Sequence, residues 1–331
     1  MMKPTGLCFL ALLTSCVLSN AHSDVTIKRD VPYRGYAHNI EMSNGTVTLY
    51  IPTEYGPRIM YYGFNGSGNA GNVFAYLPTV TNATPYGTWR IRGGTRFWHA
   101  PENMPRTYIP DNSPVKAVID GNTVSLTEPK EKPTGIVKSV KITMAPTGTN
   151  VTVTMTLTNE NLWPVTLACW MLSAMHPGGT GIFPQEPFAG HSGSLLPSRP
   201  VVLWSYTNMA DPRWTWGKQF ILFKQNPDIS TAQKAGFGNH QGWAAYDRNG
   251  LLFLKKFGYH NGATYPDYGC NNETYCSNLF EEVESVGPLT LLQPGASVSH
   301  TENWWLFANK PIPSSQSGIA QMMDPILAST K

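Results

Sequence analysis

Residues 273–307 read ETYCSNLFEEVESVGPLTLLQPGASVSHTENWWLF. The stretch predicts a strand that carries several carboxylates, then a Pro-Gly turn and an aromatic strand. Glu282 and Glu284 lie two residues apart, so on a strand both carboxylates project from the same face of the sheet. Because buried carboxylates are costly, this pattern favours a polar cleft. The alternative is a solvated edge strand whose charges prevent edge-to-edge pairing.

Short alternating or β-branched runs recur along the chain, each bounded by Gly, Pro, Asn or Asp. They cover residues 45–51, 115–119, 123–127, 137–144, 151–157, 165–172, 219–223, 251–257 and 297–306. Turn signals at residues 120–122 and 147–150 predict hairpins within a meander from 115 to 157. Almost no window shows helical spacing with a cap and a stop. The chain is therefore predicted to be all-β and antiparallel.

The 331 residues show no obvious break in composition. We expect residues 24–309 to form one domain, a large two-sheet sandwich. A Pro/Ser-rich C-terminal tail follows at 310–331, with a short helix expected around 319–327. The broad concave face of such a sandwich is a place where small ligands are held.

The N-terminus has the order of a secretory signal, with Lys3, an apolar run over residues 6–13 and then small residues. Cleavage after residues 19–21 predicts a signal peptide over residues 1–21. Alternatively, residues 13–16 resemble a lipobox, and the signal would end before a lipid-anchored Cys16. No later segment has the roughly 20 apolar residues of a membrane span. We expect an exported protein, periplasmic or extracellular.

Charge and motif content exclude several classes of protein. A net charge of +3 with scattered Lys and Arg argues against a nucleic-acid partner. The eight histidines show no metal-ligand spacing and the acidic residues no calcium-loop spacing, so no metal is expected. Neither a Gly-x-Ser-x-Gly elbow nor a phosphate-cradling loop occurs, and no cofactor is expected.

Three cysteines lie beyond the predicted signal, namely Cys169, Cys270 and Cys276. Export to an oxidising compartment predicts a Cys270–Cys276 disulfide that closes the intervening loop. The alternative is that both thiols are free. Cys169 lies in an apolar run and is predicted to be buried.

A cluster of chemically different side chains follows the glycine pair at residues 93–94. It contains Arg96, Trp98, His99 and Glu102. An aromatic ring beside charged groups suits a sugar, whose C–H face stacks on the ring while its hydroxyls bond to the charges. The alternative is a core tryptophan with a surface Arg96–Glu102 pair.

Two further regions supply weaker candidates. His176 ends the stretch WMLSAMHPGG, which begins at Trp170, and its near-neutral pKa suits a general acid or base. Residues 234–246 and 265–269 mix Gly, aromatic and ionisable residues, which we interpret as loops around a mouth. Candidates from these loops are Lys234, His240, Trp243, Tyr246 and Asp267.

Four ordered pieces of the chain resemble the galactose mutarotase-like, or aldose 1-epimerase-like, superfamily, in an uncharacterised secreted bacterial branch. They are YGPRI at 55–59, the cluster at 93–102, LTN at 157–159 with PVTL at 164–167, and EEVE at 281–284 with LQPG at 292–295. The resemblance spans roughly residues 45–307. It implies a supersandwich fold, and it adds Arg58 to the candidate substrate-binding residues.

The resemblance also implies a mechanism in which a Glu takes a proton from the anomeric hydroxyl and a His protonates the ring oxygen. Glu282 falls at the base position, with Glu284 where a Gln is usual. The family's strand-borne His falls nearest Trp170 here, so His176 or His99 would have to supply the imidazole. Independently of the family, paired groups of different basicity suit hemiacetal opening.

The sequence thus predicts an exported carbohydrate-binding protein, with aldose epimerisation by an isomerase as the leading reaction. Alternatives are a polysaccharide lyase or hydrolase, and a non-catalytic sugar-binding or envelope module. The predicted catalytic residues are Glu282, Glu284, His176 and His99. The predicted substrate-binding residues are Arg58, Arg96, Trp98, Glu102, Trp170, Lys234, Trp243 and Asp267.

Overall fold

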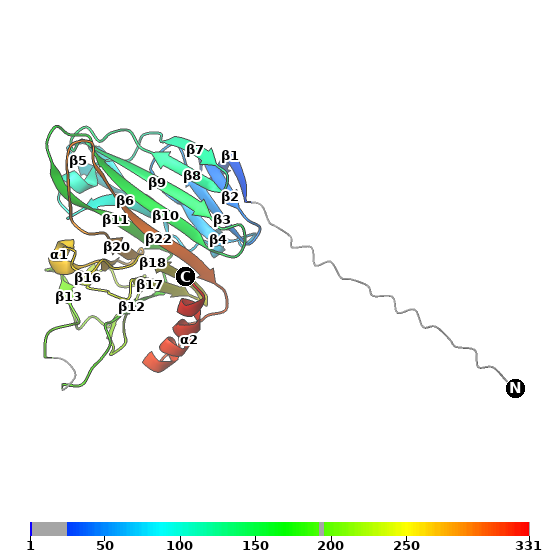
Figure 1. Cartoon of the computed structure of the whole chain (residues 1–331), viewed down its shortest axis with the longest axis vertical. Coiled ribbons are helices and arrows are strands. Elements are labelled where there is room, and N and C mark those ends of the chain that lie inside the picture. The colour runs from blue at the N-terminus through cyan, green and yellow to red at the C-terminus, as the bar shows by residue number, and fades with distance from the viewer. Residues whose placement is uncertain (2–24, 192–194, 331) are drawn as a thin grey trace.

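The computed structural model describes residue 1, residues 25–191 and residues 195–330 (Figure 1). The predicted signal segment lies outside the described residues apart from Met1, as does the alternative lipidation site at Cys16. Antiparallel strands dominate the described chain, which confirms the all-β prediction. None of its helices is long and apolar enough to cross a membrane.

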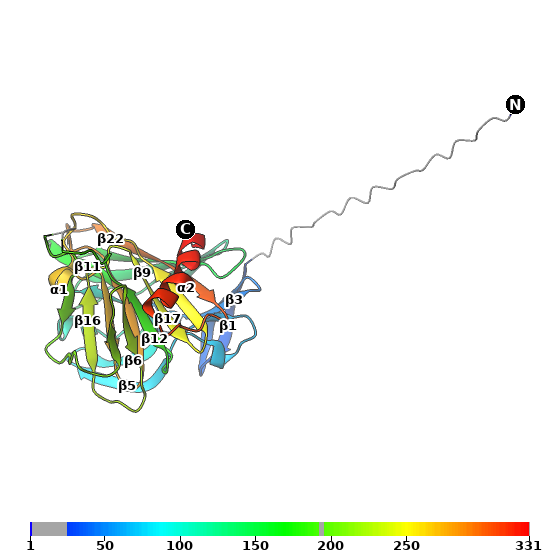
Figure 2. The same cartoon turned by 90° about the horizontal axis from the view of Figure 1, so that it is seen from below.

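The N-terminal part forms a four-stranded sheet in the order β1-β2-β3-β4. Its strands are β1 (Thr26–Tyr33), β2 (Tyr36–Ser43), β3 (Val47–Pro52) and β4 (Tyr61–Phe64). Figure 2 shows this sheet at the opposite side of the molecule from β16 and the short helix α1 (Pro266–Gly269).

A ten-stranded sheet follows the order β14-β15-β12-β17-β18-β22-β10-β9-β8-β7. Its strands are β14 (Trp214–Trp216), β15 (Phe220–Lys224), β12 (Thr180–Pro184), β17 (Trp243–Arg248), β18 (Leu251–Lys256), β22 (Ser297–Phe307), β10 (Val151–Asn159), β9 (Ile136–Met144), β8 (Thr123–Thr127) and β7 (Lys116–Asp120). Strands β7 to β10 pair in chain order, which confirms the predicted meander.

An eight-stranded sheet has the order β13-β16-β19-β20-β11-β6-β5, with β21 paired to β11. Its strands are β13 (Val201–Leu203), β16 (Gln233–Phe237), β19 (Asn272–Cys276), β20 (Glu281–Val286), β11 (Val165–Met175), β6 (Gly87–Ala100), β5 (Tyr76–Thr84) and β21 (Thr290–Leu292). Two short 3₁₀ turns, η1 (Asn69–Gly71) and η2 (Arg106–Tyr108), flank β5 and β6.

Strand β10 shows why these residues form a sandwich. Every second side chain is apolar and fully buried in the core, namely Val151, Val153, Met155 and Leu157. The threonines between them face outward and hydrogen-bond across to hydroxyl or amide side chains of β22. Such cross-strand pairs stabilise a sheet, and the period of two fixes which face is buried.

The C-terminal segment carries the helix α2 (Gln316–Ser329), which covers the expected 319–327 region and is longer. Ser315 caps its N-terminus, because its side chain accepts a hydrogen bond from the Gly318 amide. Ile319, Met323 and Ile326 are buried against apolar residues of β12, β17 and β18. The helix therefore covers part of the outer face of the ten-stranded sheet (Figure 1).

The interpretation of residues 234–246 as loops around a mouth is wrong. This segment contains most of β16 and the start of β17, and all five residues of β16 are buried. Strand β16 pairs on both sides, with β13 and β19. Ala and Gly occupy positions where branched apolar residues would have marked a strand in the sequence.

Candidate functional site

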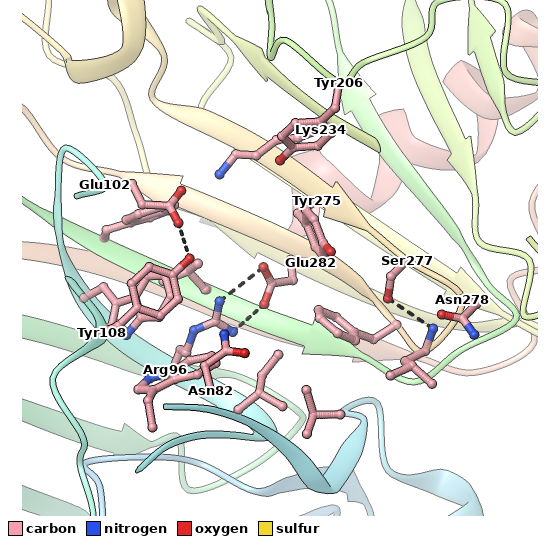
Figure 3. Close-up of a pocket in the computed structure, with 18 residues that line it drawn as sticks. Asn82, Arg96, Glu102, Tyr108, Tyr206, Lys234, Tyr275, Ser277, Asn278 and Glu282 are labelled. Atoms are coloured by element: carbon pink, nitrogen blue, oxygen red, sulfur yellow. Dashed lines mark hydrogen bonds and ion pairs between the residues drawn. The ribbon is translucent and has the colours of Figure 1, made fainter. Parts of the chain in front are cut away.

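The eight-stranded sheet carries a cavity of about 340 Å³ on the face turned away from the inter-sheet core (Figure 3). Its walls combine aromatic, charged and amide side chains. The lining residues are Val80, Asn82, Trp89, Ile91, Arg96, Trp98, Glu102, Tyr108, Trp170, Leu172, Tyr206, Lys234, Tyr275, Ser277, Asn278, Leu279, Phe280 and Glu282. We call this cavity the main pocket.

Strand pairing explains how distant parts of the chain meet in the main pocket. Trp98 of β6 lies opposite Trp170 of β11. Glu282 of β20 lies opposite Tyr275 of β19, which lies in turn opposite Lys234 of β16. Directly opposed residues point to the same face of a sheet. Five strands thus present one polar and aromatic surface.

An aromatic wall bounds one side of the main pocket. The ring centroid of Trp98 lies 5.6 Å from Trp89, 4.9 Å from Tyr108 and 5.4 Å from Trp170. The Arg96 guanidinium carbon lies 4.3 Å from the Trp98 centroid. These tilted and edge-on arrangements fix the ring planes and leave a rigid apolar surface.

Arg96 and Glu282 form a two-pronged ion pair beside this wall. One guanidinium nitrogen donates to Oε1 of Glu282, and the other donates to Oε2 at 3.3 Å. Both side chains are buried. The parallel geometry holds the guanidinium and the carboxylate in fixed orientations.

A second group of charges surrounds Lys234. Its ammonium lies 2.9 Å from Glu273 and 3.5 Å from Glu284, and 4.6 Å and 4.7 Å from the ring centroids of Trp170 and Trp204. Burial acts to lower the pKa of Lys234, but the neighbouring carboxylates outweigh it and raise the pKa well above its ordinary value. Lys234 therefore stays an ammonium ion.

The two carboxyl groups beside Lys234 titrate near neutrality. Burial raises the pKa of Glu273 to about 8 and that of Glu284 to about 7, against the opposing field of Lys234. Glu284 also accepts a hydrogen bond of 2.9 Å from the indole of Trp170. Both carboxyl groups therefore keep their protons well above the pH at which an ordinary glutamate loses its proton.

The predicted cluster at residues 93–102 divides between the two faces of β6. Arg96 and Trp98 line the main pocket, while His99 points the other way. Its Nε2 lies 3.2 Å from Glu131, and it lines a separate cavity of about 280 Å³. Desolvation lowers the pKa of His99. The expected pairing of His99 with Glu282 is therefore wrong, because neighbouring residues on a strand face opposite sides.

His176 does not meet Glu282 either. It follows the end of β11, and its Nδ1 lies 3.2 Å from the carbonyl of Pro177 outside the main pocket. No imidazole lines the main pocket among the described residues. Glu284 lies behind the pocket surface, where it contacts Trp170 and Lys234.

Three predicted substrate-binding residues have other positions. Arg58 is 1% exposed and bonds Asp111 at 2.5 Å, with further bonds to backbone carbonyls of β6, so it anchors the chain internally. Trp243 belongs to the apolar cluster beneath α2. Asp267 lies in α1 with a φ of 50°, outside the main pocket. Arg96, Trp98, Glu102, Trp170 and Lys234 do line it.

The predicted Cys270–Cys276 disulfide is absent, and both thiols are free and buried. Cys276 ends strand β19, and Cys270 precedes the start of this strand by two residues. The extended strand from residue 272 to Cys276 alone spans roughly 13 Å at about 3.3 Å per residue, whereas a disulfide needs its Cα atoms under about 7 Å apart. Cys169 is buried as predicted.

Several residues that line the main pocket were not predicted from the sequence, chiefly Trp89, Tyr108, Tyr206 and Tyr275. Tyr275 carried a usable signal, because it lies two residues after Glu273 in the quoted stretch and so shares its face. Trp89 lies on β6, the strand of Arg96 and Trp98, whereas Tyr108 ends η2 and Tyr206 lies in the turn after β13. Only the tertiary fold brings Tyr108 and Tyr206 to the pocket.

Comparison with known proteins finds no family model and no curated protein that matches the chain. Similar solved structures do exist. A TPR-domain containing protein from Parabacteroides distasonis has a TM-score of 0.57 at 15% identity over 88% of this chain, which spans about half (55%) of that structure. A candidate aldose 1-epimerase from Klebsiella pneumoniae has a TM-score of 0.53 at 11% identity, covering 92% of this chain and 88% of that one.

A galactose mutarotase-like protein from Lactobacillus casei has a TM-score of 0.50 at 12% identity, covering 81% of this chain and all (100%) of that one. At these identities the likeness concerns the fold. The chain has the all-β galactose mutarotase-like fold, as its sequence predicted.

Proposed function

From this fold and the pocket it carries, we propose that the chain binds a carbohydrate in the main pocket. The supporting observation is the juxtaposition of the aromatic wall around Trp98 with the Arg96–Glu282 pair in one cavity of about 340 Å³. A cavity of this size suits a small ligand of one or two sugar rings.

The chemistry of the walls matches that of a sugar. A pyranose ring has a C–H face that packs on an indole, and hydroxyls that both donate and accept hydrogen bonds. Glu282 supplies acceptors and Arg96 supplies donors, and their mutual pairing holds both before the ligand arrives. The amides of Asn82 and Asn278 and the hydroxyl of Ser277 add further polar groups around the pocket (Figure 3).

Titration calorimetry with a panel of aldoses and disaccharides tests the proposal. We expect Trp98→Ala to weaken binding by about tenfold, from the loss of roughly 1–1.5 kcal/mol of stacking. Trp98→Phe keeps a ring and should lose less. Trp163→Ala is the matched control, because Trp163 is 60% exposed and lies outside the main pocket. Absence of binding to every sugar, or unchanged binding by Trp98→Ala, contradicts the proposal.

A second candidate function is epimerisation of an aldose. It is favoured by the position of Glu282, which lines the main pocket and which the resemblance to mutarotases implies to be the base. The ring oxygen would need another proton donor than His, and Lys234 and the hydroxyls of Tyr108 and Tyr275 are the candidates in the pocket wall.

Polarimetry of freshly dissolved aldoses tests this candidate. Catalysed interconversion of anomers that is lost in Glu282→Gln supports it, whereas sugar binding without catalysis supports a binding module. New absorbance from uronic-acid polymers would indicate the lyase alternative instead. Export remains a prediction from residues 1–21, and fractionation of expressing cells tests it.

A further inference from the structure

A cavity of about 450 Å³ lies on the four-stranded sheet, lined by residues of β1 to β4 and of the loop at residues 65–69. Leu49 of β3 points into the core, so its neighbours Thr48 and Tyr50 point to the other face, where this cavity lies. We call it the tyrosine cavity. It shares no lining residue with the main pocket, and Figure 2 shows its sheet on the opposite side of the molecule from β16, which supplies Lys234 to that pocket.

Three tyrosines from three strands form one wall of the tyrosine cavity. Tyr50 lies opposite Glu41 on one side and opposite Tyr61 on the other, and directly opposed residues share a face. The ring of Tyr33 stacks on that of Tyr50, with centroids 4.5 Å apart and planes 13° apart. Tyr61 meets both rings edge-on, at 5.9 Å and 5.3 Å. The sheet thus presents a continuous aromatic surface.

Hydrogen bonds hold these rings in place. The hydroxyl of Tyr50 donates to Glu41 at 3.0 Å, and that of Tyr61 donates to the carbonyl of Gly68 at 3.1 Å, which ties the loop to the ring. Tyr61 is buried, while Tyr33 and Tyr50 remain partly exposed. Because the rings are already fixed, a ligand that packs on them immobilises few side chains.

The polar groups of the tyrosine cavity carry almost no net charge. Asn65 and Asn69 are exposed at its edge, and Thr48 donates a hydrogen bond of 3.3 Å to the amide oxygen of Asn65. The one carboxylate, Glu41, is neutralised by Lys28 at 3.1 Å. Among the described residues, no Lys, Arg or His lines the cavity. It therefore offers ring surface and hydrogen bonds but no cation that would hold an anionic ligand.

We propose that the tyrosine cavity is a second carbohydrate site, which binds a neutral oligosaccharide or a segment of a neutral polysaccharide. The C–H face of a sugar ring packs on the tyrosines, and its hydroxyls donate to Glu41 and accept from the amides of Asn65 and Asn69. The site is separate from the main pocket and goes beyond the function proposed for it. Two sites on opposite sides let one molecule hold two glycan segments.

The test is electrophoresis of the full chain through gels that contain a neutral polysaccharide, namely starch, a β-glucan or glucomannan, where retardation measures the Kd. All variants also carry Trp98→Ala, so that the main pocket contributes less. We expect Tyr50→Ala to raise the Kd about tenfold, and Tyr50→Phe, which keeps the ring, to raise it less. Tyr268→Ala is the matched control, because Tyr268 is 94% exposed and lines neither cavity.

Asn65→Ala separates a lost contact from a lost fold. Asn65 is an exposed loop residue, so its truncation leaves the packing of the sheet intact. We expect it to raise the Kd severalfold with an unchanged midpoint of urea unfolding.

The outcomes separate this site from the main pocket. If no polysaccharide retards the chain, or if Tyr50→Ala and Asn65→Ala migrate as their parent does, the second site is wrong. Retardation that depends on Trp98 alone overturns the second site and supports binding in the main pocket. Retardation that depends on Tyr50 and Asn65 supports the second site, even if the panel of small sugars shows no binding in the main pocket.

Discussion

Substitution of Lys255 by Met tests the polar link that lies beneath the main pocket. Lys255 is fully buried in β18, and its ammonium lies 2.8 Å from Glu302, 3.0 Å from the hydroxyl of Ser173 and 3.0 Å from the carbonyl of Val283. The last two belong to the eight-stranded sheet, so this ammonium joins the two sheets. Lys255→Met keeps most of the side-chain volume and removes the charge.

The expected loss in the free energy of unfolding follows from the interactions that Glu302 keeps after the substitution. Glu302 would keep its hydrogen bonds from Ser285 at 2.6 Å and from the Trp304 indole at 2.7 Å, but it would lose its counter-charge in a fully buried position. Removing one partner of a buried ion pair costs about 3–5 kcal/mol, whereas replacing both partners is often close to neutral. Lys255→Met should therefore lower the free energy of unfolding by about 3–5 kcal/mol.

Urea unfolding followed by tryptophan fluorescence measures this loss. The double variant Lys255→Met with Glu302→Gln removes both charges, and we expect it to be more stable than Lys255→Met alone by roughly 2 kcal/mol. A cost below about 1 kcal/mol for Lys255→Met, or strictly additive costs in the double variant, would refute the reasoning.

Three other measurements, two of them on substituted chains, test the same structure. In the folded chain the pKa is about 8 for Glu273 and about 7 for Glu284, above the ordinary 4.5, so the folded chain binds more protons than the unfolded chain. Its free energy of unfolding should therefore fall as the pH rises from about 4.5 to 8. Glu273→Gln should make this fall smaller when unfolding is measured at pH 5 and pH 8. Thiol titration in denaturant should find Cys270 and Cys276 free without added reductant, and a rise in titratable thiols on reduction would contradict the structure. His99→Gln should leave sugar affinity within about twofold, because His99 faces the other cavity, and a tenfold loss would place it in the pocket.

The sequence predicts the strand-rich fold well because its evidence is local. Alternation of Val, Met and Leu with Thr indicates strand β10 without knowledge of its partners, and the Gly121 turn indicates the hairpin of β7 and β8. Strand β16 was missed because its Lys, Ala and Gly carry no such alternation. It is a strand only because β13 and β19 flank it.

The site was predictable where the alternation along a single strand determines which side chains face the pocket. Glu282 faces the main pocket as an alternating strand requires, and Trp98 and Trp170 are there too. The prediction that His99 supplies the imidazole was wrong for an equally local reason, because Trp98 and His99 are neighbours on β6 and cannot share a face. The surroundings of Lys234 were not predictable, because they depend on the register of β16, β19 and β20.

The different surroundings of the two faces of β20 limit where residues can be inserted into or deleted from this protein. Odd-numbered and even-numbered side chains of the strand lie on opposite faces of the sheet, with Val283 in the inter-sheet core and Glu282 in the pocket. Deleting or inserting a single residue there would exchange the two faces, placing the Glu282 side chain between the sheets and the Val283 side chain in the pocket. Insertions and deletions should therefore be tolerated in exposed connecting loops away from the main pocket and should prevent folding within the strand itself.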